Sequence, residues 1–389
     1  MRFSPFVDRI GGVGSTVWEL HNRAARDFAE GRDVIVLSAG DPDFDTPAPI
    51  VNRLVESLKQ GRTHYTPAPG EPELRQAVAR HHQQTTGQAV GPEQVVIVPG
   101  TQCGLFSSLQ CVAGPGDDVI VADPMYATYA ATVGASGARL VPVAAQPSRH
   151  FHLDPADVAA AITPCTRAIL LNTPHNPTGA VLSHDELLAL AELCHQHDLW
   201  LISDEVYAPL AYDQPHISPC RLPGMDERCI TLNSLSKSHA MTGWRMGWVV
   251  GPSEFVQHMD NLTQCMLYGC PPFIQDAAVH ALSRDFEELV EMRHAFRWRR
   301  DMVLQRLAQR SDISCHKPEG GIYIMIDIRR TGQSPAIFTE ELYAKYGLAL
   351  LSGDAFGPSA NGHVRLSLSC DDKLIEDACN RLAHYLDTL

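Results

Sequence analysis

Residues 234–247 read Ser-Leu-Ser-Lys-Ser-His-Ala-Met-Thr-Gly-Trp-Arg-Met-Gly, which places Lys237 among small hydroxyl side chains and Arg245 eight positions later. Serine competes with helices and strands for backbone hydrogen bonds, so we expect Lys237 on a loop. The apolar runs on either side, residues 229–233 and 244–250, are typical of buried strands. Because α/β sheets carry their chemistry on loops at strand ends, Lys237 is the candidate centre of the protein.

A single amine with hydroxyls and a guanidinium nearby could bind a ligand that carries both an aldehyde and a phosphate. Lys237 can hold the aldehyde as a Schiff base, while the Ser236 hydroxyl and the planar fork of Arg245 bind the phosphate. Pyridoxal phosphate is such a cofactor, and it also needs a carboxylate against its ring nitrogen. The alternative is a solvated loop lysine beside a surface arginine, and the rest of the chain has to decide between the two.

Length and composition favour a globular protein with one large and one smaller domain. The chain has 389 residues, of which 44% are hydrophobic and 20% charged, and these values are ordinary for soluble proteins. A net charge of −14 without a basic run argues against nucleic acid or an anionic membrane as partner. The eleven cysteines form no CxxC pair, and no apolar run reaches the roughly 18 residues of a membrane span. We therefore expect a cytoplasmic protein with small-molecule partners and no metal.

The alternation of apolar strands with helical segments predicts a mostly parallel sheet with helices on both faces, a three-layer α/β fold. Beyond residue 252 the pattern is helical to about 310, and strands and a closing helix follow. We assign residues 40–289 to a large cofactor-binding domain, and residues 1–39 with 290–389 to a smaller α+β domain. The expected strands lie at 34–37, 94–98, 118–122, 167–172, 199–203, 229–233, 244–250, 321–327 and 363–368.

Two turns could approach a ligand. Gly100 and Thr101 separate a strand from a helix, whose free N–H groups and dipole favour a phosphate near Thr101 and Gln102. A plain helix cap is the alternative. The run 38–47 consists almost entirely of turn residues, so its backbone can approach a ligand at Gly40 or serve as a simple connector.

Two further strand ends carry groups that suit a pyridine ring. Asp204 ends a buried strand, where a carboxylate needs a cationic partner, and a protonated ring nitrogen would serve. Asn176 and Tyr207 follow strand ends and could donate hydrogen bonds to the ring oxygen. The alternatives are a turn cap for Asp204 and a loop-stabilising role for Asn176. Arg365 lies within an expected strand, where an arginine is usually a surface residue.

Together these motifs resemble the class I aminotransferases of pyridoxal phosphate fold type I. The match covers nearly the whole chain, and His175 in the Asn-Thr-Pro-His-Asn run is a departure that leaves Asn176 in place. Within the family, residues 234–245 and 261–268 are most similar to the arginine–pyruvate transaminases. The matching residues in chain order are Gly100-Thr101, Tyr126, the N-x-P-x-N-P-x-G run from 172, the D-x-x-Y run from 204, S-x-S-K with G-x-R-x-G, and Arg365.

The resemblance implies a role for each candidate residue. Lys237 would be the Schiff-base lysine that moves the proton, and Asp204 would keep the ring nitrogen protonated. A homodimer with shared sites is implied, in which Tyr65 reaches the phosphate held by the neighbouring subunit. The remaining cofactor residues would be Tyr207 and Asn176 at the ring hydroxyl, Tyr126 on the ring face, and Gly100, Thr101, Gln102, Ser234, Ser236 and Arg245 at the phosphate.

The resemblance also implies the substrates. Arg365, Gly40 and Asn176 would bind the α-carboxylate of an L-amino acid, best guessed as arginine or another basic amino acid, whose amino group passes to a 2-oxo acid such as pyruvate. Trp18 would stack on the donor's planar guanidinium. The alternatives are an aromatic or aspartate-type aminotransferase, a pyridoxal-phosphate-dependent C–S lyase on the same fold, and a non-catalytic effector domain that binds the cofactor.

Overall fold

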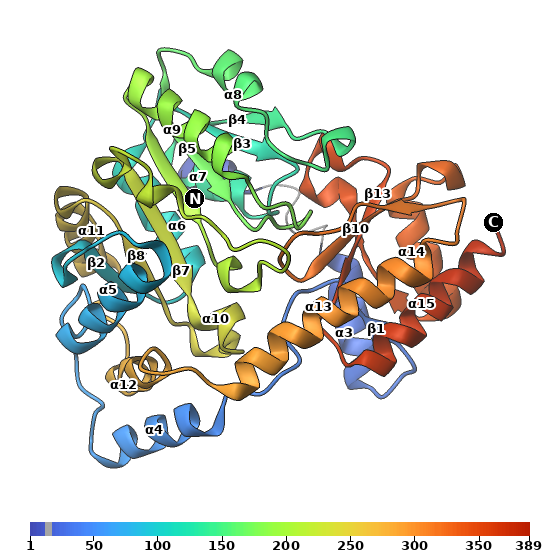
Figure 1. The fold of residues 1–389 in the computed structure, drawn as a ribbon, viewed down its shortest axis with the longest axis horizontal. Helices are drawn as coiled ribbons and strands as arrows, with labels where there is room; N and C mark the ends of the chain where they lie inside the picture. Colours follow the sequence, from blue (N-terminus) through green and yellow to red (C-terminus); the bar gives the residue numbers. More distant parts are fainter. Residues whose placement is uncertain (12–17) are drawn as a thin grey trace.

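A seven-stranded sheet forms the centre of the protein in the computed structural model, which describes residues 1–11 and 18–389 (Figure 1). The strand order is β2-β8-β7-β6-β5-β3-β4; β8 is antiparallel to β2 and β7, and the other pairs are parallel. This confirms the predicted mostly parallel sheet. The strands are β2 (Val95–Val98), β3 (Asp118–Asp123), β4 (Arg139–Ala144), β5 (Thr166–Asn172), β6 (Trp200–Asp204), β7 (Cys229–Ser234) and β8 (Gly247–Val250).

Helices cover both faces of this sheet because successive strand residues point to opposite sides. On β2, Val96 and Val98 pack with α6, α7 and α11, whereas Val95 and Ile97 pack with α4, α5 and α12. Helices α8 and α9 cover the second face farther along, over β3, β5 and β6. The bounds are α4 (Ala48–Lys59), α5 (Pro72–Thr86), α6 (Thr101–Val112), α7 (Tyr129–Ser136), α8 (Pro155–Ala161), α9 (His184–His197), α11 (Ser253–Met266) and α12 (Pro272–Ala281).

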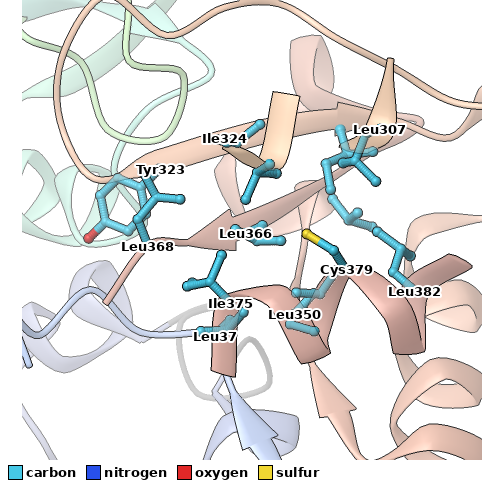
Figure 2. Close-up of a cluster of buried hydrophobic side chains, with 14 of the residues drawn as sticks. Leu37, Leu307, Tyr323, Ile324, Leu350, Leu366, Leu368, Ile375, Cys379 and Leu382 are labelled. Atoms are coloured by element: carbon cyan, nitrogen blue, oxygen red, sulfur yellow. The ribbon is translucent and has the colours of Figure 1, made fainter. Parts of the chain in front are cut away.

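A four-stranded antiparallel sheet of order β12-β13-β10-β9 lies beside the first (Figure 1). Its apolar core draws on both ends of the chain, because Leu37 packs with Leu366, Ile375 and Leu382 (Figure 2). The domain boundaries at 39/40 and 289/290 stay a prediction. The elements around this sheet are α3 (Glu19–Ala29), β1 (Ile35–Val36), α13 (Glu287–Leu307), β9 (Ser314–Cys315), β10 (Tyr323–Asp327), α14 (Pro335–Tyr346), β11 (Leu348–Ala349), β12 (Leu351–Ser352), β13 (His363–Ser367) and α15 (Asp372–Leu386). Helix α1 (Phe6–Ile10) instead packs on α7, where Arg9 Nε donates a hydrogen bond to the Gly134 oxygen.

Two local predictions around the central lysine are wrong. Lys237 lies on a single helical turn, α10 (Leu235–Ser238), rather than on an irregular loop. The serines cause this, because the Ser234 side chain accepts a hydrogen bond from the Ser236 N–H and caps the turn. The strand expected from residue 244 begins at Gly247, since the chain first makes a 3-10 turn and then a left-handed residue, Arg245, with φ of +53°.

None of the helices in residues 1–11 and 18–389 combines the length and the apolar character that a membrane span requires.

Candidate active site

Polar side chains that follow the carboxyl ends of β5, β6 and β7 meet in one pocket with the N-terminal ends of α6 and α7. Asn176, Asp204 and Lys237 come from the three strand ends. The site predicted from scattered motifs is therefore assembled in one place. The other predicted residues in its lining are Thr101, Gln102, Tyr126, Tyr207, Ser234, Ser236 and Arg245.

The turn-rich run that starts at residue 38 approaches the central lysine. Lys237 Nζ donates a hydrogen bond to the backbone oxygen of Gly40. Next to it, Thr242 Oγ1 donates a hydrogen bond of 2.7 Å to Asp41 Oδ1. A Cβ atom at position 40 would lie 1.8 Å from the Tyr323 hydroxyl oxygen, so this close approach requires glycine. The run is thus part of the site and not a simple connector.

Asp204 is a buried carboxylate whose hydrogen bonds come from neutral groups. The Tyr129 hydroxyl donates to Oδ2 at 2.7 Å, and the Val206 N–H donates to Oδ1 at 3.3 Å. Burial raises the pKa of Asp204 to about 6, although both hydrogen bonds act in the opposite direction. A cation placed against this carboxylate would offset the cost of burying its charge.

The N-terminus of α6 and Arg245 form an anion site. Gly100 precedes the helix with φ of +85°, and a Cβ atom there would lie 2.4 Å from Arg245 Nη2. Thr101 Oγ1 is buried and has no hydrogen-bond partner within the described part of the chain. The Arg245 guanidinium donates only to backbone oxygens of Thr242 and Pro99 among the described residues. Helix N–H groups, a free hydroxyl and a guanidinium together suit a phosphate.

Arg365 of β13 is buried, with 1% of its surface exposed, which overturns the expectation of a surface arginine. Its Nη1 donates to Asn176 Oδ1 at 2.8 Å and its Nη2 to the Ser38 backbone oxygen at 2.7 Å. The guanidinium lies between the rings of Tyr323 and Phe356, with Cζ 4.1 and 4.7 Å from their centroids. Because these neighbours are neutral, they leave the buried positive charge of Arg365 without a counter-charge. The arginine is therefore a candidate to bind a carboxylate of the substrate.

Sequence reasoning missed three residues of the site. Tyr129 donates to Asp204, and Asn172 Nδ2 donates to the Asp204 backbone oxygen at 2.9 Å. Asn172 had a signal, because it ends the strand beside Asp204. Tyr129 is the first residue of α7, three positions after Tyr126, and it follows the same strand end, that of β3. The Tyr323 hydroxyl lies 3.1 Å from that of Tyr207 across 116 residues of sequence, and no local pattern indicates this contact.

Five predicted residues do not line the pocket. Gly40, Gly100 and Arg365 contact residues that do, whereas Tyr65 and Trp18 lie apart from it in their own chain. Tyr65 is 91% exposed, and its ring centroid is 6.0 Å from that of Tyr268. Trp18 packs against the apolar cluster that contains Phe356 and meets His21 edge to face at 5.6 Å. The family resemblance also implies that the segment 11–21 covers the site, but residues 12–17 of that segment lie outside the described residues.

The Gln102 side chain is engaged with α7. Its Nε2 donates to Thr132 Oγ1 and its Oε1 accepts from Thr128 Oγ1, both at 2.9 Å. A phosphate at this position would therefore meet the Gln102 backbone N–H, which lies in the first turn of α6.

Known proteins resemble this chain over nearly its whole length. The family described as "Aminotransferase class I and II" matches residues 32–382. The arginine–pyruvate transaminase of Pseudomonas aeruginosa is 52% identical over 383 residues, which cover 98% of each chain. The aspartate/prephenate aminotransferase of Thermus thermophilus is 37% identical over 92% of each chain. A solved structure of a Thermus thermophilus aspartate aminotransferase mutant superposes with a TM-score of 0.93 at 34% identity, over 99% of this chain and 100% of the other.

Proposed function

The chain belongs to the class I and II aminotransferases, and on that premise we propose that it moves the α-amino group of arginine, or of another basic amino acid, to pyruvate or a similar 2-oxo acid. One observation supports the reaction most strongly: the pocket joins the Lys237 amine, the Asp204 carboxylate and, through Asn176, the Arg365 guanidinium. The choice of donor rests on the 52% identity to a protein named as an arginine–pyruvate transaminase. We place the reaction in the cytoplasm.

The site fits pyridoxal 5'-phosphate as its cofactor. The missing side chain of Gly100 leaves space beside Arg245, and the unused Thr101 hydroxyl suits a phosphate oxygen. Burial raises the pKa of Asp204, and a protonated ring nitrogen would supply a cation beside its carboxylate. When bound, the cofactor withdraws electrons from the donor's Cα. We assign the phosphate to Gly100, Thr101, Gln102, Ser234, Ser236 and Arg245, the ring oxygen to Asn176 and Tyr207, and the ring face to Tyr126.

Two residues of the chain act on the donor itself. The Lys237 amine takes up the proton from the donor's Cα as a general base. In this structure the amine donates a hydrogen bond to the Gly40 oxygen. Arg365 binds the donor's α-carboxylate beside Asn176 and Gly40, so that the Cα–H bond is held in one orientation. Asp204 would contribute by stabilising a proton on the cofactor's ring nitrogen.

A homodimer with shared sites is part of the proposal. Three apolar side chains at i, i+4 and i+7 spacing on α4, Val51, Val55 and Leu58, are 38%, 41% and 41% exposed. Such a stripe is typical of a face that another chain covers. Tyr65 is almost fully exposed a few residues farther on. In the dimer it would reach the phosphate held by the neighbouring subunit.

Replacing Arg365 with lysine is expected to raise KM for every amino donor and every 2-oxo acid together, by roughly tenfold or more. A point charge would replace a planar fork that can bind a carboxylate with two hydrogen bonds. Steady-state kinetics with arginine, lysine, pyruvate and 2-oxoglutarate check this.

Arg300→Lys is the matched control, because Arg300 is also fully buried but donates to Asp213 and the Pro318 oxygen. That variant should leave KM unchanged. An increase in KM for a single substrate in Arg365→Lys would assign Arg365 to a side-chain pocket instead.

We expect kcat/KM for arginine, with pyruvate as acceptor, to exceed that for phenylalanine and aspartate by at least about tenfold. Trp18→Leu should lower the arginine value by roughly 3- to 30-fold, because it would remove the ring that we propose stacks on the donor's guanidinium, and Trp18→Phe should retain most of it. An arginine value at or below that for phenylalanine would contradict the basic donor and favour an aromatic one.

A further inference from the structure

Tyr323 lies where the two halves of the proposed site meet. It is the first residue of β10 and is buried. Its hydroxyl lies 3.1 Å from the hydroxyl of Tyr207, and its ring lies under the Arg365 guanidinium. Figure 2 shows the hydroxyl at the rim of the apolar cluster, pointing away from Leu366 and Leu382. The side chain therefore contacts a cofactor residue with its hydroxyl and a substrate residue with its ring.

Strand pairing fixes the ring under the guanidinium. In the register of β10 and β13, Met325 lies opposite Arg365, and Tyr323 lies two residues before Met325. Residues two apart point to the same face, so Tyr323 and Arg365 are diagonal neighbours within reach of long side chains. Phe356 covers the other face of the guanidinium. The position of the Arg365 fork thus depends on the Tyr323 ring.

The hydroxyl contact has a defined direction if the proposed function holds. A phenol donates one hydrogen bond. If Tyr207 donates its hydrogen to the cofactor's ring oxygen, the Tyr323 hydroxyl must donate to Tyr207. Burial raises the pKa of Tyr207 well above its ordinary value, which keeps Tyr207 protonated and able to donate.

We propose that Tyr323 is a positioning residue with two separable roles, in which its hydroxyl orients the Tyr207 proton toward the cofactor and its ring supports Arg365 for the substrate carboxylate. The proposal rests on the proposed function. It also explains why position 40 is glycine, since a Cβ atom there would displace the Tyr323 hydroxyl and ring.

The hydroxyl role is tested by a pH titration of the bound cofactor's visible absorbance in Tyr323→Phe. Without the hydrogen bond from Tyr323, Tyr207 becomes a weaker hydrogen-bond donor to the cofactor's ring oxygen. The ring oxygen then carries more negative charge, so proton binding at the nitrogen that joins Lys237 to the cofactor becomes more favourable. The midpoint should rise by about 0.5 to 1 pH unit, the effect of one hydrogen bond, and by more in Tyr207→Phe. An unchanged midpoint in Tyr323→Phe beside a shifted one in Tyr207→Phe overturns the hydroxyl role alone.

The ring role is tested by KM values for arginine and pyruvate. Tyr323→Phe keeps the ring and should leave both within about twofold of the wild-type values, whereas Tyr323→Leu and Tyr323→Met should raise both by roughly 3- to 30-fold. Two aliphatic variants are used so that one poorly folded protein does not decide the result. Equal KM values in the Phe and aliphatic variants overturn the ring role. A wild-type protein that binds no cofactor would instead contradict the proposed function itself.

Discussion

Lys237→Ala is expected to lower kcat by more than roughly 10⁴-fold, which exceeds the contribution of a positioned general base alone. The amine is both the expected point of attachment of the cofactor and the expected base, and no second amine lines the described pocket. The variant should still retain cofactor, because the phosphate donors at Thr101 and Arg245 do not depend on the lysine. Turnover and cofactor content, measured on the same preparation, check both expectations.

Borohydride provides the direct assignment, because it converts a carbon–nitrogen double bond into a stable link that survives digestion. The chain has five lysines, at positions 59, 237, 317, 345 and 373, so peptide masses identify the labelled residue without ambiguity. Lys373→Ala, an exposed lysine in the first turn of α15, is the matched control and should keep full activity. Labelling of any lysine other than Lys237 would contradict the assignment.

Asp204→Asn is expected to reduce the rate of the chemical step by several orders of magnitude, because a neutral amide cannot stabilise a proton on the ring nitrogen. The step is measured by mixing cofactor-loaded enzyme with a single amino donor. A loss of less than about tenfold, or ~1.4 kcal/mol, would mean that Asp204 serves as a structural cap.

Glu205→Gln is the matched control for burial of a carboxylate at this strand end. Glu205 is also buried, but its contacts are Ser203, Ser218 and His216, outside the pocket. This variant should alter thermal stability more than the rate of the chemical step. Comparable losses of rate in Asp204→Asn and Glu205→Gln would show that the buried carboxylates at the end of β6 support the fold, and that Asp204 has no specific role in the reaction.

A pH series separates the functional cost of Asp204 from its structural cost. The folded-state pKa of Asp204 lies above its ordinary value, so the folded protein binds this proton more tightly than the unfolded chain does. Its contribution to stability is therefore lost as pH rises through about 6. Cofactor-free Asp204→Asn should accordingly melt at the same or a higher temperature than the wild-type protein at pH 7.5, although it is inactive.

The strand ends made most of the site predictable. Asp204 and Lys237 each follow an apolar run, and parallel strands bring their carboxyl ends to one edge, so their proximity follows from the sheet. The helical turn at Lys237 does not follow from serine's general preference for loops, because Ser234 caps this turn. A local rule failed there because the same side chain can either compete with a helix or begin it.

The part of the fold around the four-stranded sheet was harder to infer, because its contacts join distant parts of the chain. Ile35 pairs with Leu348, and Arg365 reaches Ser38, so neither partner lies within a local pattern. Arg365 by itself suggested a surface residue, and only its resemblance to a family motif indicated a role. Tyr323 had neither signal, since a tyrosine at the start of a buried strand is ordinary, and its contacts with Tyr207 and Arg365 require both sheets to be in place.

The most direct test of the account is the yield of 2-oxo acid when the cofactor-loaded enzyme meets arginine without any acceptor. A transaminase can hold only one amino group per active site until an acceptor removes it. We therefore expect one equivalent of 2-oxo acid per protomer, no ammonia, and resumed turnover when pyruvate is added. Continuous formation of product with release of ammonia would indicate a lyase or a deaminating enzyme. Absence of any 2-oxo acid from arginine, lysine, phenylalanine or aspartate would contradict the assignment of this pocket as an aminotransferase site.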